Sequence, residues 1–491
     1  MYDIRKDIGM RVLENFEPKD VLKYFEEISM IPRGSGNTKA LSDYCVSFAK
    51  DRGLFVRQDD LGNVIIKKPA TKGREQDAGV IIQGHLDMVT EKKTDSVHDF
   101  MKDSLKLYVE DGFIKAKDTT LGGDDGIAVA YGLAILDSND ISHPSLEVIF
   151  TIDEETGMDG ARELDMSDIC GRYILNLDSE EEGIFVAGCA GGAKVKAIIS
   201  YRTVMTEGIK CTVRVEGLKG GHSGVEIDKK RGNADIIMAR VLREICSHVY
   251  IECIGIKGGS KDNAIPRECV AEILVNENNI AEVKNIVNEM DNILRAELLS
   301  SDGDISVTMA ENGFGAYMVI IPEDFKNILF YLNTIPNGIQ NMSADIEGLV
   351  ETSLNLGILE TEDNCMTAVS SVRSSVGSRK KYIIDKLNDI AEKAEGFTEV
   401  RGEYPAWEYK RTSKLRELVN KTYRELFGKE PKTNVIHAGL ECGYFSEKKP
   451  DADIIAFGPD IFDIHTTEER MSIESVERCY RLIKEILKNI H

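Results

Sequence analysis

The feature that most constrains this chain is a recurring pattern of short apolar runs that end at, or shortly before, an acidic residue or a histidine. Such runs are typical of buried strands in a parallel or mixed sheet. In open α/β sheets, ligands collect beyond the carboxyl ends of the strands. The pattern therefore predicts an α/β fold with a mixed sheet and a polar site at one sheet edge. The runs are residues 80–82 before His85 and Asp87, residues 146–152 before Asp153, Glu154 and Glu155, residues 173–177 before Asp178, and residues 453–457 before His465.

Helical patterns lie between and after these runs. Residues 127–136 are apolar and rich in alanine, which predicts a buried helix. Towards residue 491, apolar side chains recur at intervals of three and four, which predicts an amphipathic helix. The residues of this second pattern are Ile473, Val476, Tyr480, Ile483, Leu487 and Ile490.

The length of 491 residues exceeds what one ordinary hydrophobic core serves, so we expect two domains. The middle of the chain alternates strand patterns, such as residues 210–216, with long helical patterns, such as residues 232–247. This part carries few acids at strand ends. We therefore expect a second, α+β domain at residues 205–402, inserted into a first domain made of residues 1–204 and 403–491.

The charge balance excludes some partners. The chain has 61 Lys and Arg and 84 Asp and Glu, a formal net charge of -23 that is spread along the sequence, whereas nucleic-acid binding needs clustered basic residues. The first residues lack the apolar segment of a secretory signal, and no stretch approaches the roughly 18 apolar residues of a membrane span. The ten cysteines include no C-x-x-C pair and are expected to be reduced thiols in the core. We expect a soluble, cytoplasmic protein without a nucleic-acid or membrane partner.

Five residues in these segments have side chains that bind metal ions. Two divalent ions held close together need imidazoles and carboxylates, one of which can bridge, and such donors suit zinc, cobalt or manganese. Asp87 can also hydrogen-bond the second ring nitrogen of a metal-bound His85. The five candidate ligands are His85, Asp124, Glu155, Asp178 and His465.

Each segment also has a simpler interpretation. His85 and Asp87 would fit an ordinary turn, and the glycine-rich residues 121–126 would fit a turn that caps the next helix. A phosphate-binding loop is disfavoured there, because two aspartates would repel a phosphate. Residues 153–155 would fit a solvated acidic run, although three acids that end an apolar strand are better placed to bind a cation. Neighbouring side chains leave a strand on opposite sides, so the two glutamates can differ in role.

Taken in chain order, these segments resemble the co-catalytic zinc exopeptidases, a family that includes aminoacylase, carnosinase and the bacterial dipeptidases. The resemblance runs from His85 to His465. It implies a mixed-sheet zinc-exopeptidase catalytic domain with an inserted α+β lid domain, and the metal-dependent hydrolysis of dipeptides, including those that end in histidine. The segments that look most like the aminoacyl-histidine or cytosolic non-specific dipeptidase branch are residues 220–224, 261–266, 336–338 and 437–443.

The resemblance implies how two divalent ions would be held, with zinc as the first choice and cobalt or manganese as alternatives. Asp124 would bridge the two ions. His85 and Asp178 would complete the site of one ion, and Glu155 and His465 would complete the site of the other.

The resemblance also implies roles for residues that bind no metal. Glu154 would be the general base, and Asp87 would orient His85. In the lid, His222 would stabilise the oxyanion of the tetrahedral intermediate, and a homodimer through the lid is compatible with the same resemblance. The residues implied for the carboxylate of a small peptide substrate and for its cleft are Asn263, Arg373 and Gly439.

Simpler roles stay open for these later candidates. Asn263 precedes Ala-Ile-Pro and would fit a turn, and Arg373 would fit a surface ion pair. His222 lies between Gly220-Gly221 and Ser223-Gly224, and these small residues leave it room to approach a ligand. His437 belongs to a segment that resembles the family, but the residue itself would also fit simple packing.

Other functions fit parts of the pattern. An N-acyl amino-acid deacylase or a tripeptidase would use the same chemistry on another substrate, and only the lid and the C-terminal segments distinguish these from a dipeptidase. A non-catalytic binding protein on the same fold would be expected to have lost ligands or Glu154, and this chain retains them. A nucleotide-binding protein is disfavoured, because no glycine-rich segment has Walker-type spacing.

Overall fold

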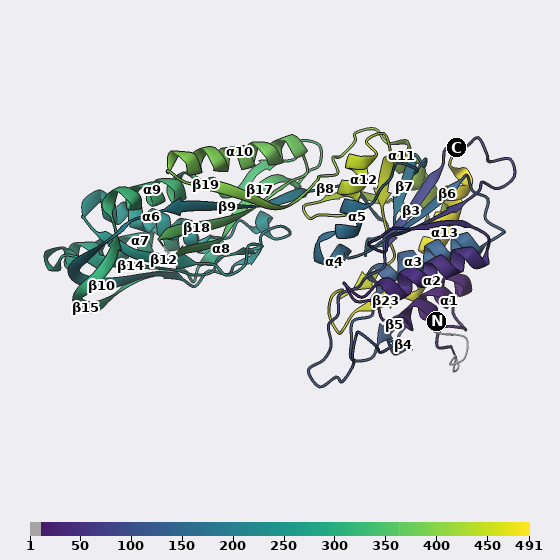
Figure 1. Ribbon diagram of the computed structural model, residues 1–491, viewed down its shortest axis with the longest axis horizontal. Coiled ribbons are helices and arrows are strands. Elements are labelled where there is room, and N and C mark those ends of the chain that lie inside the picture. The colour runs from purple at the N-terminus through teal and green to yellow at the C-terminus, as the bar shows by residue number, and fades with distance from the viewer. Residues whose placement is uncertain (1–10, 363) are drawn as a thin grey trace. The chain divides into compact units, whose positions relative to one another are not determined.

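The computed structural model describes residues 11–362 and 364–491, which form two compact units (Figure 1). The first unit consists of residues 11–188, 409–435 and 440–491. The second unit consists of Cys189–Glu408 and Ile436–Gly439. Each unit has its own hydrophobic core, so each is described by itself.

The second unit is longer than the predicted insertion at residues 205–402. It begins at Cys189, because β9 (Gly191–Ser200) pairs with β18 (Cys365–Ser374) and β19 (Phe397–Tyr404) of the same unit. It extends to Glu408, and Trp407 forms a β-bridge with Cys189. Residues 205 and 402 lie inside strands, where the chain cannot change domain. The predicted boundaries are therefore corrected to these positions.

A mixed sheet of eight strands forms the centre of the first unit. β3 (Val80–His85) lies between β6 (Leu146–Thr151) and β7 (Tyr173–Asn176) and is parallel to both. All residues of these three strands are buried, as their continuous apolar runs predict. Their carboxyl ends therefore meet at one edge. The full order is β1 (Phe55–Gln58), β2 (Val64–Lys68), β6, β3, β7, β21 (Asp453–Ala456), β8 (Ile184–Cys189) and β20 (Lys432–Ile436).

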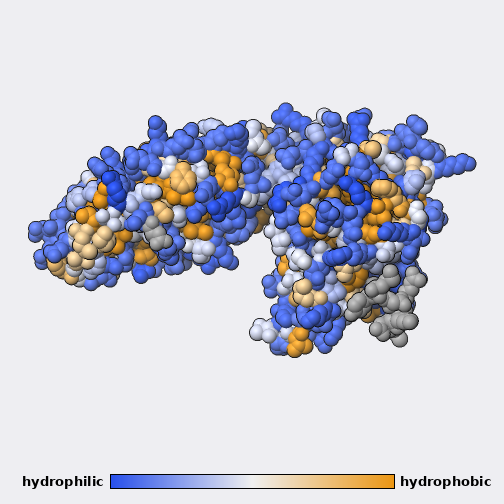
Figure 2. Space-filling view, in the orientation of Figure 1, coloured by the Kyte–Doolittle hydropathy of each residue, from blue (hydrophilic) through white to orange (hydrophobic). Residues whose placement is uncertain are grey.

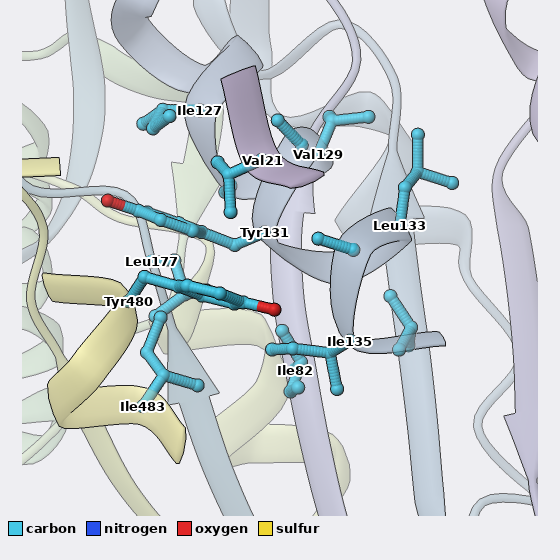
Figure 3. Packing of buried hydrophobic residues seen from close by; sticks show 14 of the residues in the cluster. Val21, Ile82, Ile127, Val129, Tyr131, Leu133, Ile135, Leu177, Tyr480 and Ile483 are labelled. Atoms are coloured by element: carbon cyan, nitrogen blue, oxygen red, sulfur yellow. The ribbon is translucent and has the colours of Figure 1, made fainter. Parts of the chain in front are cut away.

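Two helices that the sequence predicts form much of the first core. Helix α3 (Gly123–Asp137) packs on β3 and is buried from Gly123 to Leu136. Helix α13 (Ile473–Asn489) lies beside it, and the rings of Tyr131 and Tyr480 stack with centroids 6.0 Å apart (Figure 3). The Tyr131 hydroxyl also donates a hydrogen bond of 2.9 Å to the backbone oxygen of Val476. Both predicted helices are confirmed.

The first unit also contains six further helices among the described residues and a small second sheet. The loop between two strands of this sheet carries His465. The sheet consists of β22 (Ile461–Phe462), β23 (Arg470–Ser472), β5 (Phe113–Ala116) and β4 (Leu107–Glu110). The further helices are α1 (Lys19–Ser29), α2 (Lys39–Asp51), α4 (Glu154–Gly157), α5 (Asp159–Glu163), α11 (Lys414–Phe427) and α12 (Cys442–Lys448).

The second unit is an α+β domain, as the sequence predicts. Helices lie over one face of a nine-stranded antiparallel sheet (Figure 1). The helices are α6 (Ala234–His248), α7 (Ile280–Glu297), α8 (Leu299–Asp302), α9 (Pro322–Thr334) and α10 (Gly377–Lys393). The sheet has the order β14 (Cys269–Val275), β10 (Thr203–Glu216), β15 (Ser306–Ile320), β12 (Glu252–Gly258), β17 (Val350–Glu362), β18, β9 and β19, and β16 (Gly338–Met342) pairs with β17.

All ten cysteines lie in the described part of the chain and are free, as predicted. Cys170 and Cys246 are exposed and Cys365 is half-buried, so the expectation of core thiols is wrong for these three. The visible surface is largely hydrophilic (Figure 2). Within residues 11–362 and 364–491, none of the helices combines the length and the apolar composition that a membrane crossing requires.

The contact between α13 and α3 gives a stability prediction. Ile483 is fully buried in the first core, so Ile483→Ala should lower the free energy of unfolding by about 2–5 kcal/mol. Urea unfolding of the metal-free protein, followed by circular dichroism, measures this change. The control is Lys488→Ala on the exposed face of the same helix, which should change stability by less than about 0.5 kcal/mol. Equal effects of the two substitutions would contradict this packing.

Candidate metal centre

The five candidate ligands come together at one edge of the first unit's main sheet. His85 is the last residue of β3, and Asp178 follows β7 by two residues. Because β3 and β7 are parallel neighbours, their ends deliver both side chains to the same place. The other donors come from loops and helix starts: Asp124 from α3, Glu155 from α4 after β6, and His465 from the loop between β22 and β23.

The carboxylate of Asp124 lies between the two histidines. Its Oδ1 is 3.1 Å from Nε2 of His85, and its Oδ2 is 3.1 Å from Nε2 of His465. Nε2 of His465 is also 3.0 Å from Oε1 of Glu155, and Nε2 of His85 is 4.0 Å from Oδ1 of Asp178. Each oxygen of Asp124 thus faces one imidazole, with a further carboxylate beside each. A bridging carboxylate between two cations requires this arrangement.

The electrostatics of the cluster fit a cationic ligand. Burial raises the pKa of Asp178 well above its usual range, and the charges of Asp125 and Asp124 raise it further. Hydrogen bonds to Asp124 and Glu155 raise the pKa of His465 to about 10. Asp178 and His465 therefore hold their protons more tightly than usual in the metal-free chain. Divalent metal binding releases such protons, and imidazole with carboxylate is a donor set that zinc, cobalt and manganese accept.

Asp87 connects His85 to the turn that carries the two glutamates. Its Oδ1 is 3.3 Å from Nδ1 of His85, on the side of the ring away from Asp124. Its carboxylate also accepts hydrogen bonds from the backbone N–H groups of Glu154, at 3.1 Å, and Glu155, at 3.3 Å. Asp87 is fully buried, so these contacts are shielded from water. An orienting role for Asp87 requires contacts of this kind.

Glu154 and Glu155 have different surroundings although they are neighbours in α4. Among the described residues, the groups of close metal-binding atoms include Glu155, with His85 and Asp124, and none includes Glu154. Burial raises the pKa of Glu154 to about 8, and the charge of Glu441 contributes to this shift. A carboxyl group whose pKa lies near neutrality suits a general base. The different surroundings thus support separate roles for the two residues.

The structure adds three acids that the sequence analysis did not assign. Asp125 forms a close group with His85 and Asp178, and Glu180 forms one with Asp124 and Asp178. In the sequence, Asp125 is indicated by the repeated aspartate at 124–125, and Glu180 by the acidic run after Asp178. The third acid is Glu441, which is fully buried and accepts hydrogen bonds from Gln83 Nε2 at 2.6 Å and Thr151 Oγ1 at 2.7 Å.

His222 belongs to the second unit, in the short strand β11 (Gly221–His222). Its Nδ1 accepts hydrogen bonds of 3.2 Å from the backbone N–H groups of Gly224 and Val225. Burial lowers the pKa of His222, and the charge of Arg373 lowers it further. The neutral ring therefore carries its proton on Nε2, where it can donate a hydrogen bond. His222 lines a cavity of about 1190 Å³ within this unit, as does Asn263.

The other candidates of the second unit have clear structural contacts. The backbone oxygen of Asn263 accepts a hydrogen bond of 2.9 Å from Ser223, so Asn263 also supports the turn next to His222. Arg373 donates from Nη1 to the Tyr404 hydroxyl at 3.0 Å and forms no surface ion pair among the described residues. A Cβ at Gly439 would lie 2.7 Å from the Tyr404 ring, so only glycine fits there. His437 is buried and bonds Ser353 Oγ through Nε2 at 2.7 Å.

The fold and the cluster together define a class of α/β proteins with a candidate metal site at the carboxyl edge of the sheet. The chain belongs to Peptidase family M20/M25/M40, whose family model matches residues 81–489. Cytosol non-specific dipeptidase of Escherichia coli (strain K12) is 37% identical over 483 residues, which cover 98% of this chain and 99% of that protein.

Solved structures agree with this family. Aminoacylhistidine dipeptidase from Vibrio alginolyticus is 36% identical, with a TM-score of 0.92 over 98% of both chains. A tripeptidase from Staphylococcus aureus shares the fold, with a TM-score of 0.55 and 17% identity over 97% of this chain and 99% of that chain. The resemblance drawn from the sequence is therefore confirmed.

The position of Asp124 between the histidines predicts how metal is lost from variants. The purified chain should hold up to two divalent ions. Asp124→Ala should remove both, because both would share this carboxylate, whereas His465→Ala should remove one. Mass spectrometry of metal content after dialysis against limiting zinc measures this, with exposed His248→Ala as the control. An Asp124→Ala chain that retains two ions would contradict the shared carboxylate.

Proposed function

We propose that this chain is a cytoplasmic dipeptidase that needs two divalent metal ions, with zinc as the first choice and cobalt or manganese as alternatives. The observation that carries this proposal is the Asp124 carboxylate, which presents one oxygen to each of two histidines at 3.1 Å. The E. coli relative, named a cytosol non-specific dipeptidase, supports the substrate class and the compartment. Small peptides would be the substrates.

The residues of the first unit would act around the scissile peptide bond. When bound, the two ions would polarise the scissile carbonyl and lower the pKa of a water molecule. Glu154 would accept a proton from the attacking water and then donate it to the leaving amine. Asp87 would keep Nε2 of His85 directed at the site through the contact with Nδ1.

The second unit would act as a lid and supply contacts for the substrate. His222 would donate a hydrogen bond from Nε2 to the developing oxyanion. Its Nδ1 accepts two backbone hydrogen bonds, so the ring proton is on Nε2 and available for this role. Arg373 and Asn263 would hold the carboxylate of the peptide, and Gly439 would line the cleft where the Tyr404 ring packs against its backbone. A homodimer through the lid would let His222 serve the partner's site.

The alternatives differ in substrate or in chemistry. A tripeptidase or an N-acyl amino-acid deacylase would use the same metal-binding residues. The two relatives that are 36–37% identical over 98% of this chain favour the dipeptidase. A non-catalytic binding protein is disfavoured, because the cluster retains every predicted ligand and a separate Glu154.

Glu154→Gln should separate metal binding from catalysis. Because Glu154 lies outside the groups of close metal-binding atoms, the variant should keep its ions and lose about 10²–10⁴-fold in kcat. Metal analysis and steady-state kinetics on the same preparation test this. Glu155→Gln is the matched control, since it should lose metal as well as activity. The opposite result, metal loss in Glu154→Gln alone, would mean that the two roles are exchanged.

A substrate panel tests the proposed reaction itself. Unblocked dipeptides, including those that end in histidine, should be cut faster than tripeptides or N-acetyl amino acids, because the cleft would be short and would hold the carboxylate end. Chelation should abolish hydrolysis, and zinc, cobalt or manganese should restore it. If acetylated amino acids are the best substrates, the deacylase alternative replaces this proposal.

A further inference from the structure

A buried carboxylate outside the metal cluster holds the turn that carries Asp124. Oε2 of Glu469 accepts hydrogen bonds from the backbone N–H groups of Leu121, at 2.8 Å, and Gly122, at 3.0 Å. Its Oε1 accepts from Gly123, at 2.8 Å, and Asp124, at 3.4 Å. Glu469 is only 3% exposed. These N–H groups begin α3, where the backbone has no helical partners and a negative charge is favourable.

A buried guanidinium holds the same turn from its carbonyl side. Nη2 of Arg33 donates to the backbone oxygen of Gly122, and Nη1 donates to the backbone oxygens of Leu86 and Asp87 at 3.2 Å each. Arg33 is 2% exposed. Glu469 therefore binds the N–H groups of both peptide units next to Gly122, and Arg33 binds the C=O of Gly122 itself. Arg33 also ties this turn to the end of β3, which carries His85.

Two glycines make room for this arrangement. A Cβ at Gly122 would lie 2.5 Å from Nη2 of Arg33, and a Cβ at Gly126 would lie 2.4 Å from the same atom. Gly122 also has a φ of 65°, a conformation that favours glycine. The glycine-rich residues 121–126 thus have a defined purpose: they let a buried guanidinium contact the backbone next to Asp124.

The segment that carries Glu469 also carries His465, four residues earlier. Nε2 of His465 faces Oδ2 of Asp124 at 3.1 Å, while Glu469 binds the backbone of the same aspartate. On the other side, Arg33 binds the residues that follow His85, whose Nε2 faces Oδ1. The two charged residues therefore fix the Asp124 turn to the segment of each histidine.

We propose that Arg33 and Glu469 are positioning residues that set the Asp124 carboxylate between His85 and His465, and thereby control the binding of both metal ions. We call the pair the Asp124 clamp. The inference rests on the metal role of Asp124 in the proposed function. The clamp makes no contact with substrate; it acts through the backbone of the turn. A purely structural pair would affect only the stability of the first unit.

The test uses Glu469→Gln in the full chain. The substitution keeps the size of the side chain but replaces one acceptor oxygen with an NH₂ group that faces two N–H donors. Zinc affinity, measured by competition with a chromophoric chelator, should fall about 10–100-fold for both ions. The visible absorption spectrum of the cobalt-loaded protein should change as well. The control is Glu468→Gln, whose side chain is 69% exposed and pairs with Lys93, and it should leave both readouts unchanged.

Two further variants keep the test decisive if Glu469→Gln does not fold. Glu469→Asp retains both acceptor oxygens on a shorter chain and should recover part of the lost affinity. Arg33→Lys retains the charge but not the fork that reaches three carbonyl groups, so it should weaken zinc binding in the same way. Circular dichroism of each metal-free variant identifies folded protein. Wild-type zinc affinity and an unchanged cobalt spectrum in any folded Gln or Lys variant would overturn the clamp.

The outcome also separates this inference from the proposed function. A wild-type chain that binds two ions but cuts no dipeptide would contradict the proposed function and leave the clamp to be judged by zinc affinity. A wild-type chain that binds no divalent ion would contradict both.

Discussion

The site depends on one carboxylate held between two imidazoles. Asp124 faces His85, which lies 39 residues away in the sequence, and His465, which lies 341 residues away. All three side chains are surrounded by further acids, and Asp124 is 9% exposed. Buried negative charge is costly unless a positive charge compensates it. Protons on the histidines can meet this need, and two divalent ions would meet it in the proposed enzyme.

The architecture explains how distant segments reach this one carboxylate. The parallel strands β6, β3 and β7 end side by side. His85 is the last residue of β3, and Glu155 and Asp178 follow β6 and β7. Helix α3 packs on β3, which places its first turn above the same edge. Backbone contacts by Arg33 and Glu469 then tie the Asp124 turn to its neighbours. The sheet thus positions the candidate ligands, and two buried charged side chains contact the turn that carries Asp124.

Much of this could be predicted from the sequence, because continuous apolar runs identify buried strands and parallel strands share one edge. Roles at the edge could not be read from spacing alone: His85 with Asp87 also fits a turn, and the pattern acquired meaning only through the family resemblance. The sequence predicts the start of the second unit too late in the chain. The residues of β9 have the pattern of an ordinary strand, and only the pairing of β9 with β18 and β19 assigns it to that unit. The role of Glu469 cannot be predicted from the sequence, because this residue binds backbone N–H groups more than 340 residues away and no residue pattern indicates such a contact.

The shared carboxylate can be tested most directly by a crystal structure of the zinc-loaded chain with anomalous data at the zinc edge. We predict two anomalous peaks about 3.5–4 Å apart, with one oxygen of Asp124 about 2.0–2.2 Å from each. One peak should lie beside His85 and the other beside His465. A single peak, or two peaks that share a ligand other than Asp124, would contradict the account.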